Sequence, residues 1–242
     1  MQKTSRLRFL VLAVLGSLPL VLTRPFYRLF FGYRIGKRVS LGFSIIDADE
    51  CTIDNDVSIG HFNVITRVEK LLIKDHARIG HFNIIRGGKE VSLGRYSEIL
   101  RMNQINSIPE PDAVTPTDPR FLLGDGSVIT SSHKVDFTDR VEIGNRTIIG
   151  GRNSSLWTHN RQRTRPITIG AFAYVGSEIR VAPGGTIPSR CIVGIGSVIT
   201  GNLTQTECLI AGVPAKVIKP LDSEDIQLVE RKTRADLPDD IS

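Results

Sequence analysis

The residues in this sequence best suited to chemistry are its five histidines. His61 and His81 lie in the matching segments IGHFNVI and IGHFNII, His133 follows a Thr-Ser-Ser run, and His159 lies two positions after the only tryptophan, Trp157. An imidazole titrates near neutral pH, so each histidine can act as a general base toward a hydroxyl or amine, or can bind a metal ion. Which of them a substrate or metal reaches depends on the elements that carry them.

An aliphatic residue recurs at every sixth position over the last third of the chain, at Ile169, Val175, Val181, Ile187, Val193 and Ile199. This spacing is typical of a parallel β-helix, in which each six-residue repeat forms one side of a triangular coil with its aliphatic side chain inward. Ordinary strands alternate with a period of two, so a chance alignment in another kind of β-protein does not account for several rows in step.

Three such rows extend upstream once insertions at the corners are allowed, and they predict eight stacked coils. The first row is Ile35, Ile53, Ile73, Leu93, Leu123, Ile143, Ile169 and Ile187. The second is Leu41, Ile59, Ile79, Ile99, Ile129, Ile149, Val175 and Val193. The third is Ile65, Ile85, Ile105, Val135, Val181 and Ile199, with Ile46 one position early and Leu156 one late.

The extra residues of the longer coils fall after the third side, so one corner of the solenoid is decorated. Two long excursions leave from this corner: residues 106–120, which are rich in proline, and residues 157–166. Loops of this length inside a compact repeat are usually functional, because they add nothing to the stacking of the coils. We therefore expect the functional site at this corner.

The basic character of the chain is confined to its N-terminus. Residues 1–40 contain eight basic residues and no acidic one, so the rest of a chain with a formal charge of +6 is net negative. The body has no basic stripe with interleaved aromatic residues, which argues against nucleic-acid binding. The cysteines Cys51, Cys191 and Cys208 are odd in number and unclustered, so we expect reduced thiols and no disulfide framework.

Residues 9–22 form an uncharged apolar run that Gly16 and Pro19 interrupt. A membrane span needs roughly 20 apolar residues, so this run is too short, and cations flank it on both sides. We expect residues 1–34 to form a helical segment on the cytoplasmic leaflet of the inner membrane, peripheral or monotopic. Two alternatives remain. One is a secretory signal, although no small-x-small cleavage site precedes Arg24. The other is a helix that caps the first coil of a cytoplasmic protein.

The chain divides into three parts on this pattern. The N-terminal segment 1–34 precedes a β-helix over residues 35–220, and residues 221–242 form a tail. Ile226, Leu228 and Val229 lie among charged residues in this tail, which predicts a short amphipathic helix that caps the last coil or packs on a neighbouring subunit. The acidic end at Asp239-Asp240 is expected to lie outside it.

The segment PITIGAFAYVGSEIRVAPGGTIPSRCIVGIGSVITGNL, followed by AGVPAKVIKPL, resembles the C-terminal half of the hexapeptide-repeat acyltransferases. The resemblance is specific over residues 166–220 and weaker, though in register, over 35–165. It implies an all-β fold, a left-handed parallel β-helix, whose handedness the spacing alone does not give. It also implies acetyl transfer from acetyl-CoA, and we expect a homotrimer.

In that family an active-site histidine lies shortly before a proline and an Ile-Gly repeat, and His159 before Pro166 matches this pattern. The resemblance implies that His159 is the general base for an acceptor hydroxyl that attacks a thioester. Trp157 and Asn160 lie beside it, and we expect them to contact the acceptor, with the tryptophan ring stacking on a sugar.

His133 is the rival for the catalytic role, because the segment from Thr130 to Asp136 also resembles an element of some sugar acetyltransferases. In the register above it lies at a different corner from His159. A trimer brings different corners of neighbouring subunits together, so the two histidines can share a cleft. His133 then binds the acceptor or orients His159, with Asp136 as a further candidate partner.

The donor implied by the resemblance is an acyl-CoA whose pantetheine arm lies along the C-terminal coils. Gly176, Ala182 and Ser197 lie on the matching stretch, where small residues permit close approach. Lys216 and Lys219 follow and are candidates to meet the nucleotide phosphates. No phosphate-binding glycine loop after a strand competes with this assignment.

The acceptor is the least determined part of the reaction. Acetylation of a hydroxyl on a sugar or lipid-linked saccharide in surface polysaccharide biosynthesis fits a membrane-apposed enzyme, and N-acetylation of an amino sugar fits the same base. A zinc-dependent, carbonic-anhydrase-like β-helix is another alternative, because His61 and His81 are expected to stack on one outward edge. The ligand spacing of that class is absent and His76 faces another side, so we expect no metal. A non-catalytic β-helix scaffold also remains open.

Overall fold

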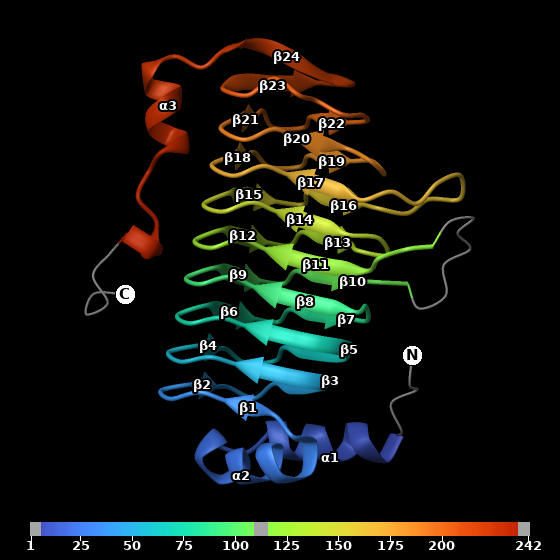
Figure 1. Ribbon diagram of the computed structural model, residues 1–242, viewed down its shortest axis with the longest axis vertical. Helices are drawn as coiled ribbons and strands as arrows, with labels where there is room; N and C mark the ends of the chain where they lie inside the picture. The colour runs from blue at the N-terminus through green and yellow to red at the C-terminus, as the bar shows by residue number, and fades with distance from the viewer. Residues whose placement is uncertain (1–5, 109–115, 237–242) are drawn as a thin grey trace.

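The three aliphatic rows of the sequence become the interior of a triangular solenoid (Figure 1). The computed structural model describes residues 6–108 and 116–236, which form a left-handed parallel β-helix on a helical base. Each coil has three sides, named here faces A, B and C in chain order. The corners between them are the AB, BC and CA corners, and the CA corner leads into the next coil.

Three stacks of short parallel strands make the faces. Face A consists of β1 (Arg34–Ile35), the later parts of β3 (Ile45–Ile53) and β5 (Val64–Ile73), β8 (Glu90–Leu93), β11 (Arg120–Leu123), β14 (Val141–Ile143), β17 (Ile167–Ile169) and β20 (Thr186–Ile187). Face B consists of β2 (Ser40–Leu41), β4 (Ser58–Ile59), β6 (Arg78–His81), β9 (Glu98–Arg101), β12 (Val128–Ser131), β15 (Ile148–Arg152), β18 (Tyr174–Val175), β21 (Ile192–Val193) and β23 (Cys208–Gly212). Face C consists of the earlier parts of β3 and β5, β7 (Ile84–Arg86), β10 (Gln104–Asn106), β13 (Lys134–Asp136), β16 (Ser155–Trp157), β19 (Arg180–Val181) and β22 (Val198–Ile199).

Strand pairing confirms the predicted register in all three rows. On face C, for example, Ile65 pairs with Ile85 and Ile85 with Ile105, and the side chains of all three are fully buried. Leu156 pairs with Val135 below it, although it lies one position late in the sequence. A register shift between β12 and β15 takes up the extra residue at the BC corner before it reaches face C.

Two helices close the open first coil, α1 (Arg6–Gly16) and α2 (Leu20–Phe31). The sequence predicted one apolar helix here, but Pro19 begins a new one, because proline offers no N–H and disfavours a helical conformation in the residue before it. Leu12 and Tyr27 are buried against the coil. A Cβ on Gly16 would collide with the carbonyl of Ser44, so α1 lies directly on β3. The buried side of these helices therefore covers the first coil, as the alternative of a capping helix describes.

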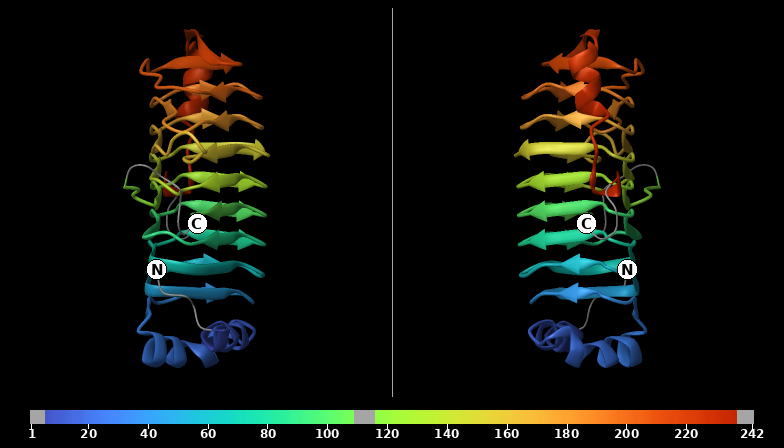
Figure 2. Two further views of the ribbon diagram at one scale, coloured as in Figure 1. Left: turned by 90° about the vertical axis from the view of Figure 1, so that its right-hand side faces the viewer. Right: turned by 90° about the vertical axis from the view of Figure 1, so that its left-hand side faces the viewer.

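No helix in the two described ranges is long and apolar enough to cross a membrane. At the other end, β23 turns back into the antiparallel β24 (Ala215–Pro220), and α3 (Ser223–Val229) begins at the side-chain cap of Asp222. The chain then descends beside the stack to a short 3₁₀ turn, η1 (Arg234–Asp236) (Figure 2). Arg234 pairs there with Glu98, far below the last coil. Residues Asp239-Asp240 lie outside the described part.

Candidate active site

The CA corner is the decorated edge that the sequence predicts. Both excursions project from it, one after β10 and one after β16 (Figure 1). Residues 109–115 of the first excursion, with two of its prolines, lie outside the described chain. The second is described completely and carries His159.

The second excursion is a short hairpin that its own backbone holds. Arg165 N donates to the carbonyl of Thr158 at 2.9 Å, and Asn160 N donates to the carbonyl of Arg163 at 3.0 Å. The side-chain oxygen of Asn160 accepts from the backbone of Gln162 and Arg163, both at 2.9 Å. The amide that we expected to contact the acceptor thus forms the turn of the hairpin, a role typical of asparagine.

His159 lies on the inner strand of this hairpin and is half-buried. It forms an antiparallel bridge with Thr164, and its Nδ1 lies 2.7 Å from the Thr164 hydroxyl. No hydrogen bond joins its Nε2 to any residue that the structure describes. Because residues that face each other in an antiparallel pair point to the same side, the Thr164 hydroxyl fixes the orientation of the ring.

Asp136 and Thr158 anchor the base of the hairpin. The Thr158 hydroxyl is buried and donates to Asp136, 3.1 Å from its Oδ1, and it accepts from the backbone N–H of Asp139 at 3.0 Å. Asp136 Oδ1 also accepts from the N–H of Thr138 at 2.8 Å. Asp136 therefore positions the segment that leads into His159. The hydrogen bonds of the described residues do not join it to His133, the partner suggested by the sequence.

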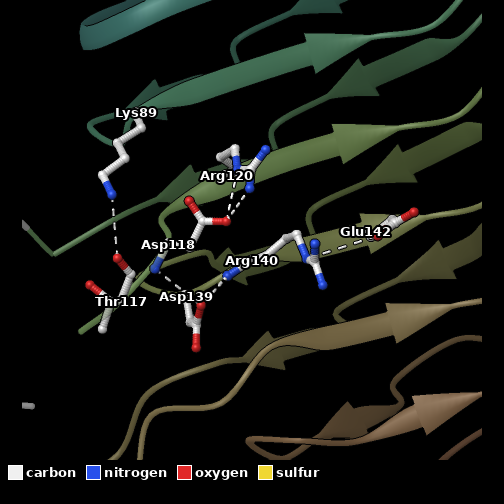
Figure 3. A network of polar contacts seen from close by, with 7 residues as sticks. All are labelled: Lys89, Thr117, Asp118, Arg120, Asp139, Arg140 and Glu142. Atoms are coloured by element: carbon white, nitrogen blue, oxygen red, sulfur yellow. Dashed lines mark hydrogen bonds and ion pairs between the residues drawn. The ribbon is translucent and has the colours of Figure 1, made fainter. Parts of the chain in front are cut away.

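A polar network joins this anchor to the first excursion (Figure 3). Asp139 Oδ1 accepts from the backbone of Asp118 at 3.2 Å and of Arg140 at 2.8 Å. Arg120 Nε donates to Asp118 Oδ2 at 2.8 Å, and this bond holds the pKa of the Asp118 carboxyl below its usual value. Since Asp139 also donates to Thr158, the returning end of the first excursion and the foot of the second are connected. Sequence reasoning missed Asp139, because nothing in its local pattern marks it.

His133 lies at the BC corner, as the register predicts, and is fully buried. It continues a ladder of buried amides, in which Asn63, Asn83 and Asn103 stack one per coil. The Oδ1 of each asparagine accepts the backbone N–H of the next rung, and Asn103 Oδ1 accepts that of His133 at 2.9 Å. The histidine thus takes the place of an asparagine in a structural column.

Both ring nitrogens of His133 are engaged. Nδ1 accepts from the backbone N–H of Ser154 at 3.1 Å, which requires the hydrogen to be on Nε2, and Nε2 lies 2.9 Å from the Thr130 hydroxyl. Burial lowers the pKa of His133 to about 4. In this arrangement the ring is neutral and has no free nitrogen to accept a proton from a substrate.

The residues expected to bind the donor do not lie on one edge of the solenoid. Gly176 and Ser197 lie at the BC corner, where Ser197 is buried and donates to the carbonyl of Gly194 at 2.6 Å. Ala182 lies at the CA corner, above His159. Lys216 is exposed on β24, and Lys219 pairs with the acidic cap of α3, 2.7 Å from Asp222.

The CA edge above His159 consists of small residues that the sequence analysis did not single out as a group. Ala182, Gly184 and Gly185 follow β19, and Gly201 lies one coil higher. A Cβ built on Gly201 meets no atom within 4 Å, so this edge is open there. Such an edge admits a narrow, flexible chain.

His61 and His81 stack one coil apart on the outward side of the BC corner, with ring centroids 5.6 Å apart and an angle of 9° between the rings. Each Nδ1 accepts a backbone N–H from the coil below, at 3.1 Å for His61 and 2.9 Å for His81. Their stacking confirms the expected arrangement. Within residues 6–108 and 116–236, no group of three or more His, Cys, Asp or Glu side chains is placed to hold a metal ion.

Comparisons with family models and solved structures show which known proteins this chain resembles. A search of protein-family models finds no match. Among solved structures, the chain is similar to the UDP-N-acetylglucosamine acyltransferase from Campylobacter jejuni, with a TM-score of 0.60 and 19% identity over 81% of this chain and 77% of that one. A second solved UDP-N-acetylglucosamine acyltransferase gives a TM-score of 0.54 at 16% identity, over 81% and 76% of the two chains. The chain has the fold of the hexapeptide-repeat acyltransferases.

Sequence similarity to curated proteins is confined to a short stretch. Galactoside O-acetyltransferase of Escherichia coli K12 is 37% identical over 60 residues, or 25% of this chain and 29% of that protein. The candidate lipopolysaccharide biosynthesis O-acetyl transferase WbbJ of the same organism is 38% identical over 58 residues, or 24% and 29%. The chain thus spans less than a third of the length of these relatives, and both are named as O-acetyl transferases.

Proposed function

We propose that the protein transfers an acetyl group from acetyl-CoA to a sugar hydroxyl, with His159 as the general base. The observation that carries this proposal is the setting of His159. It is a half-buried imidazole on the decorated edge, oriented through Nδ1 by Thr164, and no described residue bonds its Nε2. Of the two histidines weighed from the sequence, His133 is buried and engaged at both nitrogens, which favours His159 as the base.

The proposed reaction is a direct transfer. Nδ1–H of His159 donates to the Thr164 hydroxyl, which leaves the lone pair on Nε2 for the acceptor. The acceptor oxygen attacks the thioester carbonyl carbon while Nε2 takes the hydroxyl proton. The carbon–sulfur bond then breaks, and the proton on Nε2 passes to the departing thiolate. The products are the sugar acetate and the free thiol of coenzyme A, and the imidazole returns to its starting state.

The open CA edge supports an acyl-CoA as the donor. A pantetheine arm is a narrow, unbranched chain, and the edge is open at Gly201, whereas the side chain of Arg165 lies against Gly184. Lys216 remains a candidate for the nucleotide phosphates, because it is exposed beyond the last coil. Gly176 and Ser197 reach the same donor only if a neighbouring subunit presents its BC corner to this edge.

A homotrimer is part of the proposal for this reason. The BC corner of the lower coils exposes a column of large apolar side chains, Phe43, Phe62, Phe82 and Met102, each about half exposed. Phe62 and Phe82 stack with ring centroids 5.1 Å apart. Exposed apolar patches of this kind mark interaction sites, and a three-fold arrangement would set each BC corner against a neighbour's CA corner.

The acceptor proposed is a saccharide, in line with the names of the two E. coli relatives. Trp157 ends β16 beside the hairpin and is 45% exposed, so its ring is available for stacking on a sugar. We further propose that the helical base attaches the enzyme to the cytoplasmic face of the inner membrane, where a lipid-linked saccharide is accessible. Its exposed apolar helix surfaces and the basic N-terminal segment support this placement.

A mass-spectrometric assay of acetyl-CoA with a panel of free and lipid-linked sugars and amino sugars tests the proposal. We expect His159→Ala to reduce turnover by at least about a hundred-fold, the lower end of general-base effects, and His133→Asn to retain it. Greater loss from His133→Asn in a folded protein would contradict the assignment. Turnover of an amino sugar alone would favour N-acetylation, and failure to bind acetyl-CoA would favour a scaffold. Carbon dioxide hydration by protein that contains zinc would favour the anhydrase.

A further inference from the structure

The helical base exposes many large apolar side chains. On α1, Leu7, Leu10 and Val14 are between 60% and 72% exposed, at the spacing of one helix face, and Leu18 follows the helix at 43%. On α2, Val21, Leu22, Phe26, Leu29 and Phe30 are between 48% and 86% exposed. Leu12, Leu15 and Tyr27 on the opposite side of the helices pack on the first coil, so most of the exposed apolar side chains face away from it. Both helices lie below the first coil (Figure 1).

The charges around this surface fit an anionic lipid layer. The first 40 residues contain no acidic side chain, and Arg28, Arg34 and Lys37 are exposed at the margin of the base. An apolar helix surface bordered by cations is the pattern of a helix that lies in a membrane interface. Asp49 and Glu50 line a groove beside Arg8 and Phe30 at one edge of the base, whereas α2 and β1 carry basic and no acidic side chains. A lipid surface under α2 is therefore the favoured partner.

The site lies far from this base along the axis of the solenoid. Five coil steps on face C separate β3 from β16, through β5, β7, β10 and β13. At about 4.8 Å between neighbouring strands, these steps raise His159 about 24 Å above the first coil. The helical layer adds about 10 Å, of which an interfacial helix buries about 5–10 Å. His159 therefore stands about 25–30 Å above the lipid surface when the base is embedded.

This height is fixed by the fold. Every step between the coils is a hydrogen-bonded strand pair over a continuous apolar core, and Arg8 ties α1 to the first coil through its 2.8 Å ion pair with Asp47. A sugar joined directly to a membrane lipid cannot reach His159 while the base is embedded. A sugar several residues out along a lipid-linked chain can.

We propose that the protein stands upright on its base on the membrane and modifies the outer sugars of a lipid-linked saccharide, using the solenoid as a spacer that excludes sugars next to the lipid. This inference rests on the proposed function. It adds the part of the acceptor that the enzyme selects and the structural reason for that selection.

Energy transfer to acceptor-labelled lipids tests the upright orientation. The three native cysteines are buried, so a single exposed cysteine can be labelled selectively. Ser40→Cys reports on the first coil, Gln162→Cys on the His159 hairpin and Thr204→Cys on the top, and all three positions are exposed. On vesicles of phosphatidylglycerol and phosphatidylcholine, transfer should decrease in that order. Equal transfer from all three positions would mean that the solenoid lies on its side, and would overturn the proposal.

Acceptor length tests the consequence for chemistry. The native enzyme is given acetyl-CoA and a series of polyprenyl-diphosphate saccharides of increasing length, either in vesicles or dispersed in detergent. In vesicles, transfer to the shortest acceptors should fall to the background rate, because these acceptors are too short to span the distance from the lipid surface to His159. In detergent, acceptors of all lengths should react. Equal transfer to short and long acceptors in vesicles would refute the spacer.

A variant released from the membrane is the matched control. Val21→Glu with Leu29→Glu places charges on two apolar positions of α2 that are 86% and 80% exposed, so folding should be unaffected. In solution this variant can approach a vesicle in any orientation and should acetylate short acceptors that the native enzyme cannot reach. Failure of both proteins to acetylate any saccharide in detergent would count against the proposed function instead. Absence of vesicle binding by the native enzyme, with dimers formed through the base, would identify a second copy as the partner and overturn the inference.

Discussion

Replacement of His133 by asparagine should remove an acid-sensitive contribution to stability without breaking the polar column that contains it. The three rungs below are asparagines whose amides bond as this position requires, so His133→Asn keeps the chemical pattern of the ladder. His133 is fully buried, and its neutral ring accepts from Ser154 through Nδ1. Protonation would place a hydrogen where that N–H now donates.

The size of the effect follows from the pKa of His133, which burial lowers from 6.5 to about 4. Between these two values the unfolded chain binds a proton that the folded chain does not, so stability falls as the pH drops through this window. A shift of this size corresponds to roughly 3 kcal/mol once the pH is below both values. Between pH 7 and pH 5 alone, the loss is about 2 kcal/mol.

Urea unfolding of the native protein and of His133→Asn at pH 7 and pH 5 measures this quantity. Other groups also titrate in this range, but their contribution is common to both proteins, so the difference between the two pH dependences isolates His133. We expect the native protein to lose about 2 kcal/mol more than the variant. Identical pH dependences would show that His133 is not held neutral, and the argument against it as a solvent-accessible base would lose its support.

Four further substitutions test other parts of the structure. Thr164→Val removes the hydroxyl that orients His159, and the loss of this one hydrogen bond should lower kcat about ten-fold with little change in KM. An altered KM with a normal kcat would mean that Thr164 contacts the substrate instead. Thr158→Val removes the anchor of the hairpin and should reduce the free energy of unfolding by about 1–3 kcal/mol in urea titrations, and an unchanged value would show that the anchor is dispensable. Gly80→Ala would drive a Cβ into a carbonyl of the next coil and should reduce the free energy of unfolding by about 1–3 kcal/mol. Gly201→Ala meets no atom within 4 Å and should change the stability little. Equal shifts of the melting temperature for the two variants would argue against this coil contact.

The fold could be predicted because its determinants are local and repeated. An inward aliphatic residue such as Ile59 lies six positions before the inward residue of the next face, Ile65, and one coil before Ile79 in its own row. The period is therefore visible without knowledge of the rest of the chain. The decorated corner followed from the same arithmetic, because excess residues can leave the register only at a corner. The stacking of His61 on His81 followed from their identical contexts.

The roles of the polar residues depended on which corner each one occupies and on what faces it from another coil. His133 and His159 have the same side chain and similar settings in the sequence, yet one replaces an amide in a buried column and the other stands on an open edge. Asp136 is three positions from His133, but strand pairing sets it beside Thr158, from the next coil.

The amino-acid sequence by itself determined the solenoid, its three rows and the edge that carries the excursions, because a periodic apolar pattern specifies its own burial. Only the tertiary structure decided which imidazole keeps a free nitrogen and how far that edge stands from the helical base. Hydrogen-bond partners and heights along the axis arise between coils about twenty residues apart, where no local pattern records them.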